Sequence, residues 1–73
     1  MTLADQRNGA VLRIVQVHCP GVTGVRLLEM GLVPGTTVEV IDRGRLGLPM
    51  QLLVRNYRLS VRRAEARRIE VQG

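Results

Sequence analysis

The side chains best suited to nucleophilic catalysis are scarce in this chain. It contains one histidine, His18, one cysteine, Cys19, and one tyrosine, Tyr57. A nucleophile needs an adjacent base and usually a third group that orients the base. His18 and Cys19 are sequence neighbours, and neighbouring side chains in an extended segment point in opposite directions. We therefore expect no catalytic centre and no enzymatic activity.

Metal and nucleotide sites have equally little support. A tetrahedral metal site normally takes about four ligands, mostly cysteine or histidine. His18 is a weak candidate that could join Glu29, or a second copy of the chain, around a divalent ion, although an ordinary loop histidine is the simpler interpretation. The stretch GRLGLP (44–49) lacks the lysine and the strand-to-helix context of a phosphate-binding loop. We expect no cofactor.

Charge is the clearest compositional signal. All 11 basic residues are arginines, against 6 acidic residues, so the formal net charge is +5. Such a surface favours a nucleic acid, an anionic membrane face or an acidic protein as partner. The basic runs RGR (43–45) and RRAEARR (62–68) keep a nucleic-acid-binding barrel as the alternative function. Single-strand binders stack bases on aromatic rings, and the single aromatic residue, Tyr57, counts against it.

Length and cysteine content indicate one small domain over residues 1–73. A chain this short must bury a compact core, which here is built from Leu, Val, Ile and Met because aromatic residues are nearly absent. A single cysteine cannot form an intramolecular disulfide, which favours the reducing cytoplasm. No segment approaches the roughly 18 apolar residues of a membrane span. We therefore expect membrane association only through a partner, without direct insertion.

Five short strands and one brief helix are the elements that must position any site. Val38 and Val40 alternate with polar residues, which predicts a half-buried strand from Thr37. The other strands are predicted at 10–17, 50–54, 57–61 and 67–71, with Tyr57, Leu59 and Val61 on one face of the fourth. Such a set predicts a mainly β fold, a small barrel whose closure would remove exposed strand edges.

The helix is predicted from about Gly24 to Met30, with Thr23 as its N-cap. Apolar residues three positions apart can share a face of this helix, while charged residues between them point to water. The expected inner residues are Val25, Leu27, Leu28 and Met30, and the expected outer residues are Arg26 and Glu29.

The segment after this helix is the most strongly specified local structure of the chain. Gly31 can take the left-handed conformation that ends a helix, with Leu32 folding back on Leu27 as in a Schellman motif. Pro34-Gly35 is typical of a type II turn, because proline presets the first central position and glycine tolerates positive φ at the second. A rigid helix-to-strand corner is expected.

Three stretches of the chain resemble the FeoA family, the small cytosolic accessory proteins of bacterial ferrous iron transport. MTLADQRNG (1–9) resembles the family's opening, RLLEMGLVPGTTVEV (26–40) its central helix, turn and strand, and LPMQLLVRNYRLSVRRAEARRIEV (48–71) its closing half. Order, spacing and turn residues agree over nearly the whole chain. The positions that match the family pattern are Arg26, Leu27, Leu28, Gly31, Leu32, Pro34, Gly35, Pro49, Tyr57 and Ala66.

The resemblance implies an SH3-like barrel and a non-enzymatic partner of FeoB, the membrane GTPase that moves ferrous iron inward. The chain would work in the cytoplasm, recruited to the inner face of the membrane by that partner. Relatives often carry an acidic residue before the loop proline, where this chain has Leu48. The residues expected to fix the fold are Gly31, Pro34, Gly35, Pro49 and Tyr57. The candidate contact residues are Arg26, Leu27, Glu29, Met30 and Leu32.

Overall fold

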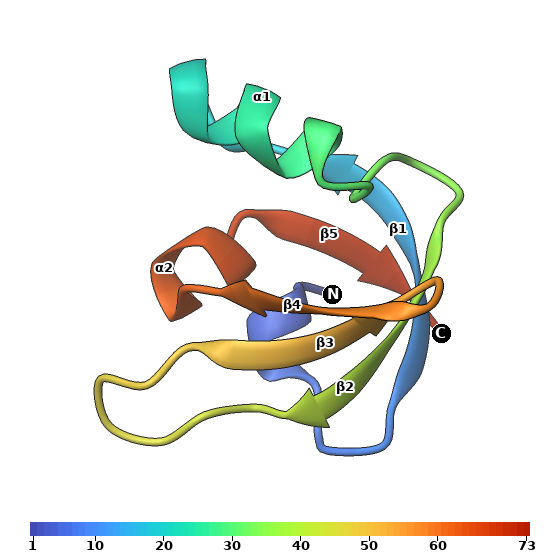
Figure 1. The fold of residues 1–73 in the computed structure, drawn as a ribbon, viewed down its shortest axis with the longest axis vertical. Helices are drawn as coiled ribbons and strands as arrows, with labels where there is room; N and C mark the ends of the chain where they lie inside the picture. Colours follow the sequence, from blue (N-terminus) through green and yellow to red (C-terminus); the bar gives the residue numbers. More distant parts are fainter.

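The strands form one curled antiparallel sheet with the order β4-β3-β2-β1-β5 (Figure 1). The computed structural model describes residues 1–73. Its strands are β1 (Val11–Val17), β2 (Thr37–Asp42), β3 (Met50–Val54), β4 (Tyr57–Val61) and β5 (Ile69–Gln72). Its helices are the 3-10 turn η1 (Leu3–Asp5), α1 (Gly21–Glu29) and α2 (Arg63–Ala66). The mainly β, barrel-like fold is confirmed. The prediction that the sheet closes and leaves no exposed strand edge is wrong, because β4 and β5 do not pair.

The inner face of the sheet carries the core. Successive strand residues point to opposite faces, and β3 follows this rule with Met50, Leu52 and Val54 fully buried. All the buried side chains are apolar, so no polar group has to be satisfied inside the core. The buried residues with apolar side chains are Leu3, Ala4, Leu12, Ile14, Leu27, Leu32, Val38, Val40, Met50, Leu52, Val54, Leu59, Val61, Ala66, Ile69 and Val71.

The strand predictions match the structure at β3 and β4, whereas β1 begins one residue later than predicted and β5 covers 69–72 instead of 67–71, because residues 67 and 68 follow α2. β3 and β4 have the predicted bounds, and Leu59 and Val61 are buried as expected. Tyr57 was predicted on the same inner face but is 42% exposed. It begins β4 at the rim of the sheet, where its hydroxyl lies close to Gly31 instead of entering the core.

Helix α1 differs from the prediction in both its start and its orientation. It begins at Gly21 after an extended Pro20, so Thr23 lies inside the helix and is not its N-cap. Gly24 and Leu27 face the core, whereas Val25 and Leu28 are exposed. The reason is the close approach of α1 to the preceding loop, because a Cβ on Gly24 would overlap the carbonyl oxygen of Cys19.

The corner after α1 has the predicted geometry. The Leu32 amide donates to the Leu27 carbonyl at 3.1 Å and the Gly31 amide to the Leu28 carbonyl at 3.0 Å, the two bonds of a Schellman motif. Gly31 has φ +102°. The type II turn is confirmed by the bond from the Thr36 amide to the carbonyl of residue 33 and by positive φ at residue 35.

We expect Gly31→Ala to lower the free energy of unfolding by about 1 kcal/mol or more, because left-handed backbone disfavours any side chain. The added Cβ would also lie 2.8 Å from the Tyr57 hydroxyl oxygen. Denaturant unfolding of Gly31→Ala alone and combined with Tyr57→Phe separates the cost of the left-handed backbone from the cost of the contact with the Tyr57 hydroxyl. The loss should be smaller when Tyr57→Phe is already present, and an unchanged stability of Gly31→Ala itself would contradict the assigned corner.

Candidate functional site

His18 and Cys19 each contact a glutamate that is distant in the sequence, Glu70 and Glu65 respectively. His18 Nε2 lies 3.1 Å from Glu70 Oε1 on β5, not near the predicted Glu29, because Val17 at the end of β1 pairs with Ile69. No cluster of three or more His, Cys, Asp or Glu side chains is placed to hold a metal ion. Burial raises the pKa of the Cys19 thiol, and the Glu65 carboxylate adds to the rise, while Arg68 opposes it. The thiol is therefore protonated, and weakly nucleophilic, at neutral pH.

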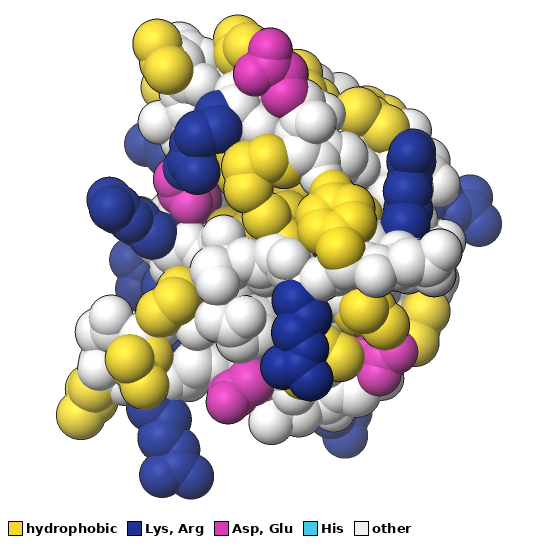
Figure 2. Space-filling model, in the orientation of Figure 1, with side chains coloured by type: hydrophobic (Ala, Val, Ile, Leu, Met, Phe, Trp, Pro, Cys, Tyr) yellow, Lys and Arg dark blue, Asp and Glu magenta, His cyan; other side chains and the backbone are white.

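The exposed face of α1 carries an apolar stripe. Val22, Val25 and Leu28, spaced three residues apart, are 84%, 55% and 42% exposed, and Figure 2 shows hydrophobic side chains gathered over this helix. The sequence pattern did not reveal the stripe, because the helix was predicted to begin at Gly24 with Val25 and Leu28 in the core. When a surface helix carries apolar residues on its outer as well as its inner side, a second surface is expected to cover the outer side.

The five predicted contact residues separate into two groups. Leu27 and Leu32 have no exposed surface, so their assignment as contacts is corrected: they are core residues that position the corner. Arg26 and Glu29 are exposed, and Met30 is partly exposed. Together with the apolar stripe, these three residues form the surface that we call the helix corner: Val22, Val25, Arg26, Leu28, Glu29 and Met30.

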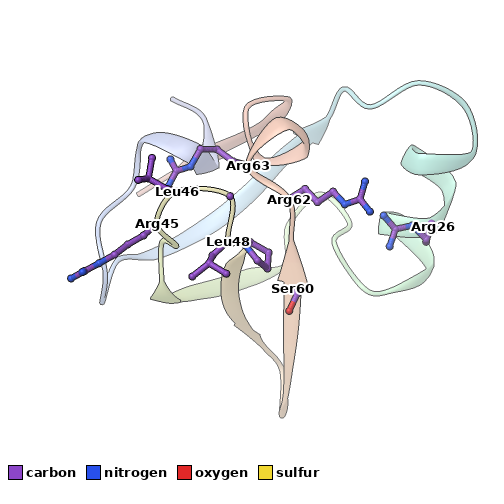
Figure 3. Close-up of a pocket in the computed structure, with 9 residues that line it drawn as sticks. Arg26, Arg45, Leu46, Leu48, Ser60, Arg62 and Arg63 are labelled. Carbon is purple, nitrogen blue, oxygen red and sulfur yellow. The ribbon is translucent and has the colours of Figure 1, made fainter.

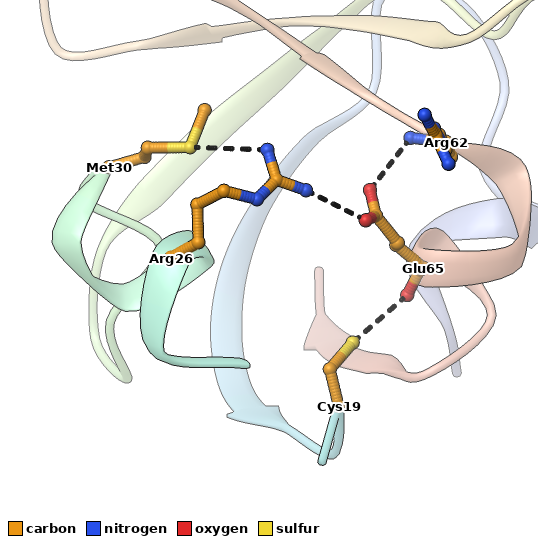
Figure 4. A network of polar contacts seen from close by, with 5 residues as sticks. All are labelled: Cys19, Arg26, Met30, Arg62 and Glu65. Carbon is orange, nitrogen blue, oxygen red and sulfur yellow. Dashed lines mark hydrogen bonds and ion pairs between the residues drawn. The ribbon is translucent and has the colours of Figure 1, made fainter. Parts of the chain in front are cut away.

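A polar network holds α1 against α2 (Figure 4). Arg26 Nη2 lies 2.9 Å from Glu65 Oε2, and the Arg62 amide donates to Glu65 Oε1 at 3.1 Å. Arg26 Nη1 lies 3.9 Å from the Met30 sulfur. A half-exposed ion pair contributes at most about 1 kcal/mol, so its main effect is to orient the Arg26 side chain toward α2.

An arginine-lined groove lies between this network and the β2–β3 loop (Figure 3). Its volume is about 720 Å³. The Arg63 guanidinium closes the base of the loop by donating to the Arg43 carbonyl at 2.7 Å and the Gly44 carbonyl at 3.3 Å. The predicted structural residue Pro49 contributes to the wall. The lining residues are Arg26, Arg45, Leu46, Gly47, Leu48, Pro49, Ser60, Arg62 and Arg63.

Residues 1–73 match the model of the FeoA domain. The chain is 38% identical over 72 residues to a fusion protein of Fe(2+) transport protein A and the Fe(2+) transporter FeoB from Porphyromonas gingivalis. That match covers 99% of this chain, which spans 8% of the length of the relative.

Solved structures show the same fold. The FeoA protein of Chlorobium tepidum superposes with a TM-score of 0.91 at 29% identity, covering 99% of this chain and 69% of the other. The zinc-complexed FeoA of Stenotrophomonas maltophilia, described as an SH3 domain protein, gives 0.82 at 28% identity, covering 99% and 89%. These matches confirm the SH3-like fold.

Proposed function

The chain belongs to the FeoA family, which is associated with ferrous iron transport, and from this premise we propose that it is a non-enzymatic adaptor of a FeoB-type membrane GTPase. None of its helices is long and apolar enough to cross a bilayer. In this proposal the chain works in the cytoplasm, and the cytosolic region of the transporter recruits it to the inner face of the membrane and is modulated by it. It supplies a binding surface and carries no cofactor.

The fused relative supports this pairing of partners. In the Porphyromonas gingivalis protein the two components are parts of one polypeptide. Covalent linkage keeps two binding modules at high effective concentration, so a fusion is advantageous for two components that must bind each other. The Stenotrophomonas maltophilia relative is described as a candidate activating factor of ferrous iron transport, in keeping with modulation.

The exposed apolar stripe on α1 is the observation that carries the proposal. Val22 and Val25 are 84% and 55% exposed on a short helix of a protein with few other outward valines. An exposed apolar patch rimmed by polar residues marks an interaction surface, and here Arg26 and Glu29 supply the rim. The Schellman corner at Gly31 holds this helix at a fixed angle, so the surface is preorganised and loses little entropy on binding.

Capture of the chain by the purified cytosolic region of the FeoB-type transporter, with and without guanine nucleotide, tests the proposal. We expect Val25→Glu, Met30→Glu and Arg26→Glu to weaken capture about tenfold or more. The first two introduce a negative charge into an apolar contact, and the third reverses a charge. Val11→Glu is the matched control, since Val11 is 59% exposed on β1. Its capture should remain at the wild-type level.

Three results would contradict the adaptor function. The first is equal capture of Val25→Glu and Val11→Glu, and the second is no capture of the wild-type chain. The third is tight RNA or DNA binding that falls steeply with salt through counterion release, is indifferent to residues 25, 26 and 30, and is lost when arginines 62, 63, 67 and 68 become alanine.

A further inference from the structure

The outer edge of β4 has no backbone partner. Residues 57–61 pair with β3 on one side, and none of them takes part in a backbone hydrogen bond outside that pairing. The opposite edge strand, β5, is partly covered by the N-terminus, where the Val71 amide donates to the Met1 carbonyl at 2.9 Å and Thr2 bridges Glu70. The free row of donors and acceptors on β4 can therefore pair with another strand.

The arginine-lined groove begins where β4 ends. Ser60 and Arg62 contribute to its lining, and Arg26 on α1 points toward Arg62 from one end of it, as Figure 3 shows. The two ion pairs of the chain involve His18 and Arg26, so the guanidinium groups of Arg45 and Arg62 have no carboxylate partner. These unpaired guanidinium groups extend in opposite directions from the lining (Figure 3), and each favours a carboxylate, which it can bind in bidentate geometry.

Two exposed leucines stand beside these arginines. Leu46 is fully exposed and Leu48 is 62% exposed. Their loop is held in place, because the Leu48 amide donates to the Arg45 carbonyl at 2.6 Å across a turn in which Gly47 has φ +75°. A fixed loop that displays apolar and basic side chains together complements a segment that carries both apolar and acidic side chains.

We infer that the free edge of β4 binds an extended acidic segment of a partner protein, which adds as a further antiparallel or parallel strand and extends into the groove. Main-chain hydrogen bonds to residues 57–61 would give affinity, and alternate side chains would give specificity. Carboxylates would meet Arg45 and Arg62, and apolar side chains would cover Leu46 and Leu48. The inference rests on the proposed function only in placing this segment on the FeoB-type transporter.

The charge of the edge selects against other occupants. A second copy of this chain would bring a net charge of +5 and an identical Arg58 to the same edge, and like charges across paired strands are destabilising. Single-stranded nucleic acid needs aromatic stacking partners, and none lines the groove. An anionic bilayer offers no extended backbone to pair with β4.

Short capped peptides test this inference directly on the full chain. One peptide alternates Glu and Val, a second alternates Lys and Val, and a third is the Glu-Val peptide with prolines in place of some valines. We expect the Glu-Val peptide to bind at least tenfold more tightly than the other two, because Lys removes the charge match and proline removes backbone donors. Binding should slow amide hydrogen exchange within residues 57–61.

Charge reversal separates the groove from the general basic surface. The double variant Arg45→Glu with Arg62→Glu should weaken peptide binding about tenfold or more, whereas Arg7→Glu, an exposed arginine outside the groove, should change it less than twofold. Equal binding of the Glu-Val and Lys-Val peptides would overturn the inference. Unchanged exchange at 57–61, or tighter binding to phosphatidylglycerol vesicles or single-stranded RNA than to the peptide, would overturn it as well.

The outcomes also distinguish this inference from the adaptor function. Peptide binding without capture by the transporter's cytosolic region would contradict the adaptor function but not the inference that β4 and the groove bind an acidic segment. Capture without peptide binding would contradict that inference but not the adaptor function.

Discussion

Leu27→Ala should lower the free energy of unfolding by about 2–5 kcal/mol, the range for truncating a fully buried leucine. Leu27 has no exposed surface and packs from the inner face of α1 into the core, and its carbonyl accepts the Schellman bond from Leu32. In a domain whose total stability is of the order of 5–15 kcal/mol, this loss is large enough to disorder the helix corner.

The neighbouring leucine provides the matched control. Leu28 is 42% exposed, so Leu28→Ala should cost less than about 1 kcal/mol, because little buried volume is removed. Denaturant unfolding measures both losses. Capture by the transporter should fall in both variants, but only in Leu27→Ala should it fall together with stability. Equal stabilities for the two variants would contradict the register that we assign to α1.

Gly24→Ala should destabilise the chain although alanine is the better helix former. Helix propensity alone predicts a gain of about 1 kcal/mol from this exchange. The new Cβ would instead overlap the Cys19 carbonyl oxygen, and a backbone atom cannot rotate away as a side chain can. We expect the free energy of unfolding to fall by about 3 kcal/mol or more, which is the upper end of the range for overpacked cores.

Two control substitutions isolate this overlap. Gly35→Ala meets no atom within 4 Å and has φ +93°, so it should lose only the cost of left-handed backbone, about 1–2 kcal/mol. Thr23→Ala, one position before Gly24, should be close to neutral or slightly stabilising. Thermal and denaturant unfolding followed by circular dichroism rank the three variants. A stability gain for Gly24→Ala would show that α1 does not approach the 18–20 loop as closely as described.

Local structure was largely determined by the sequence itself. The alternation at Val38 and Val40 located β2, and the pattern of residues 50–61 located β3 and β4 at their observed bounds. Gly31 and the Pro34-Gly35 pair determined the corner, because positive φ and a preset φ are properties of single residues. Together with the closing stretch 48–71, this corner was enough to indicate the family.

The orientation of α1 was decided only by tertiary packing. Apolar residues surround much of this helix, so a 3.6-residue period fits an inner face through Val25 and Leu28 as well as one through Leu27. The close contact of Gly24 with Cys19 excludes an inner face through Val25 and Leu28. This contact leaves Val22, Val25 and Leu28 exposed, the surface on which the proposed adaptor function depends.

The unpaired edge and the groove likewise came from the folded chain. Five strands of these lengths are compatible with closed and open sheets alike, and the observed order leaves β4 and β5 as edges. Arg26 and Glu65 lie 39 residues apart in the sequence and pair at 2.9 Å, while the guanidinium groups of Arg45 and Arg62 have no carboxylate partner. Local periodicity cannot predict such pairings, because they depend on which distant segments the core brings together.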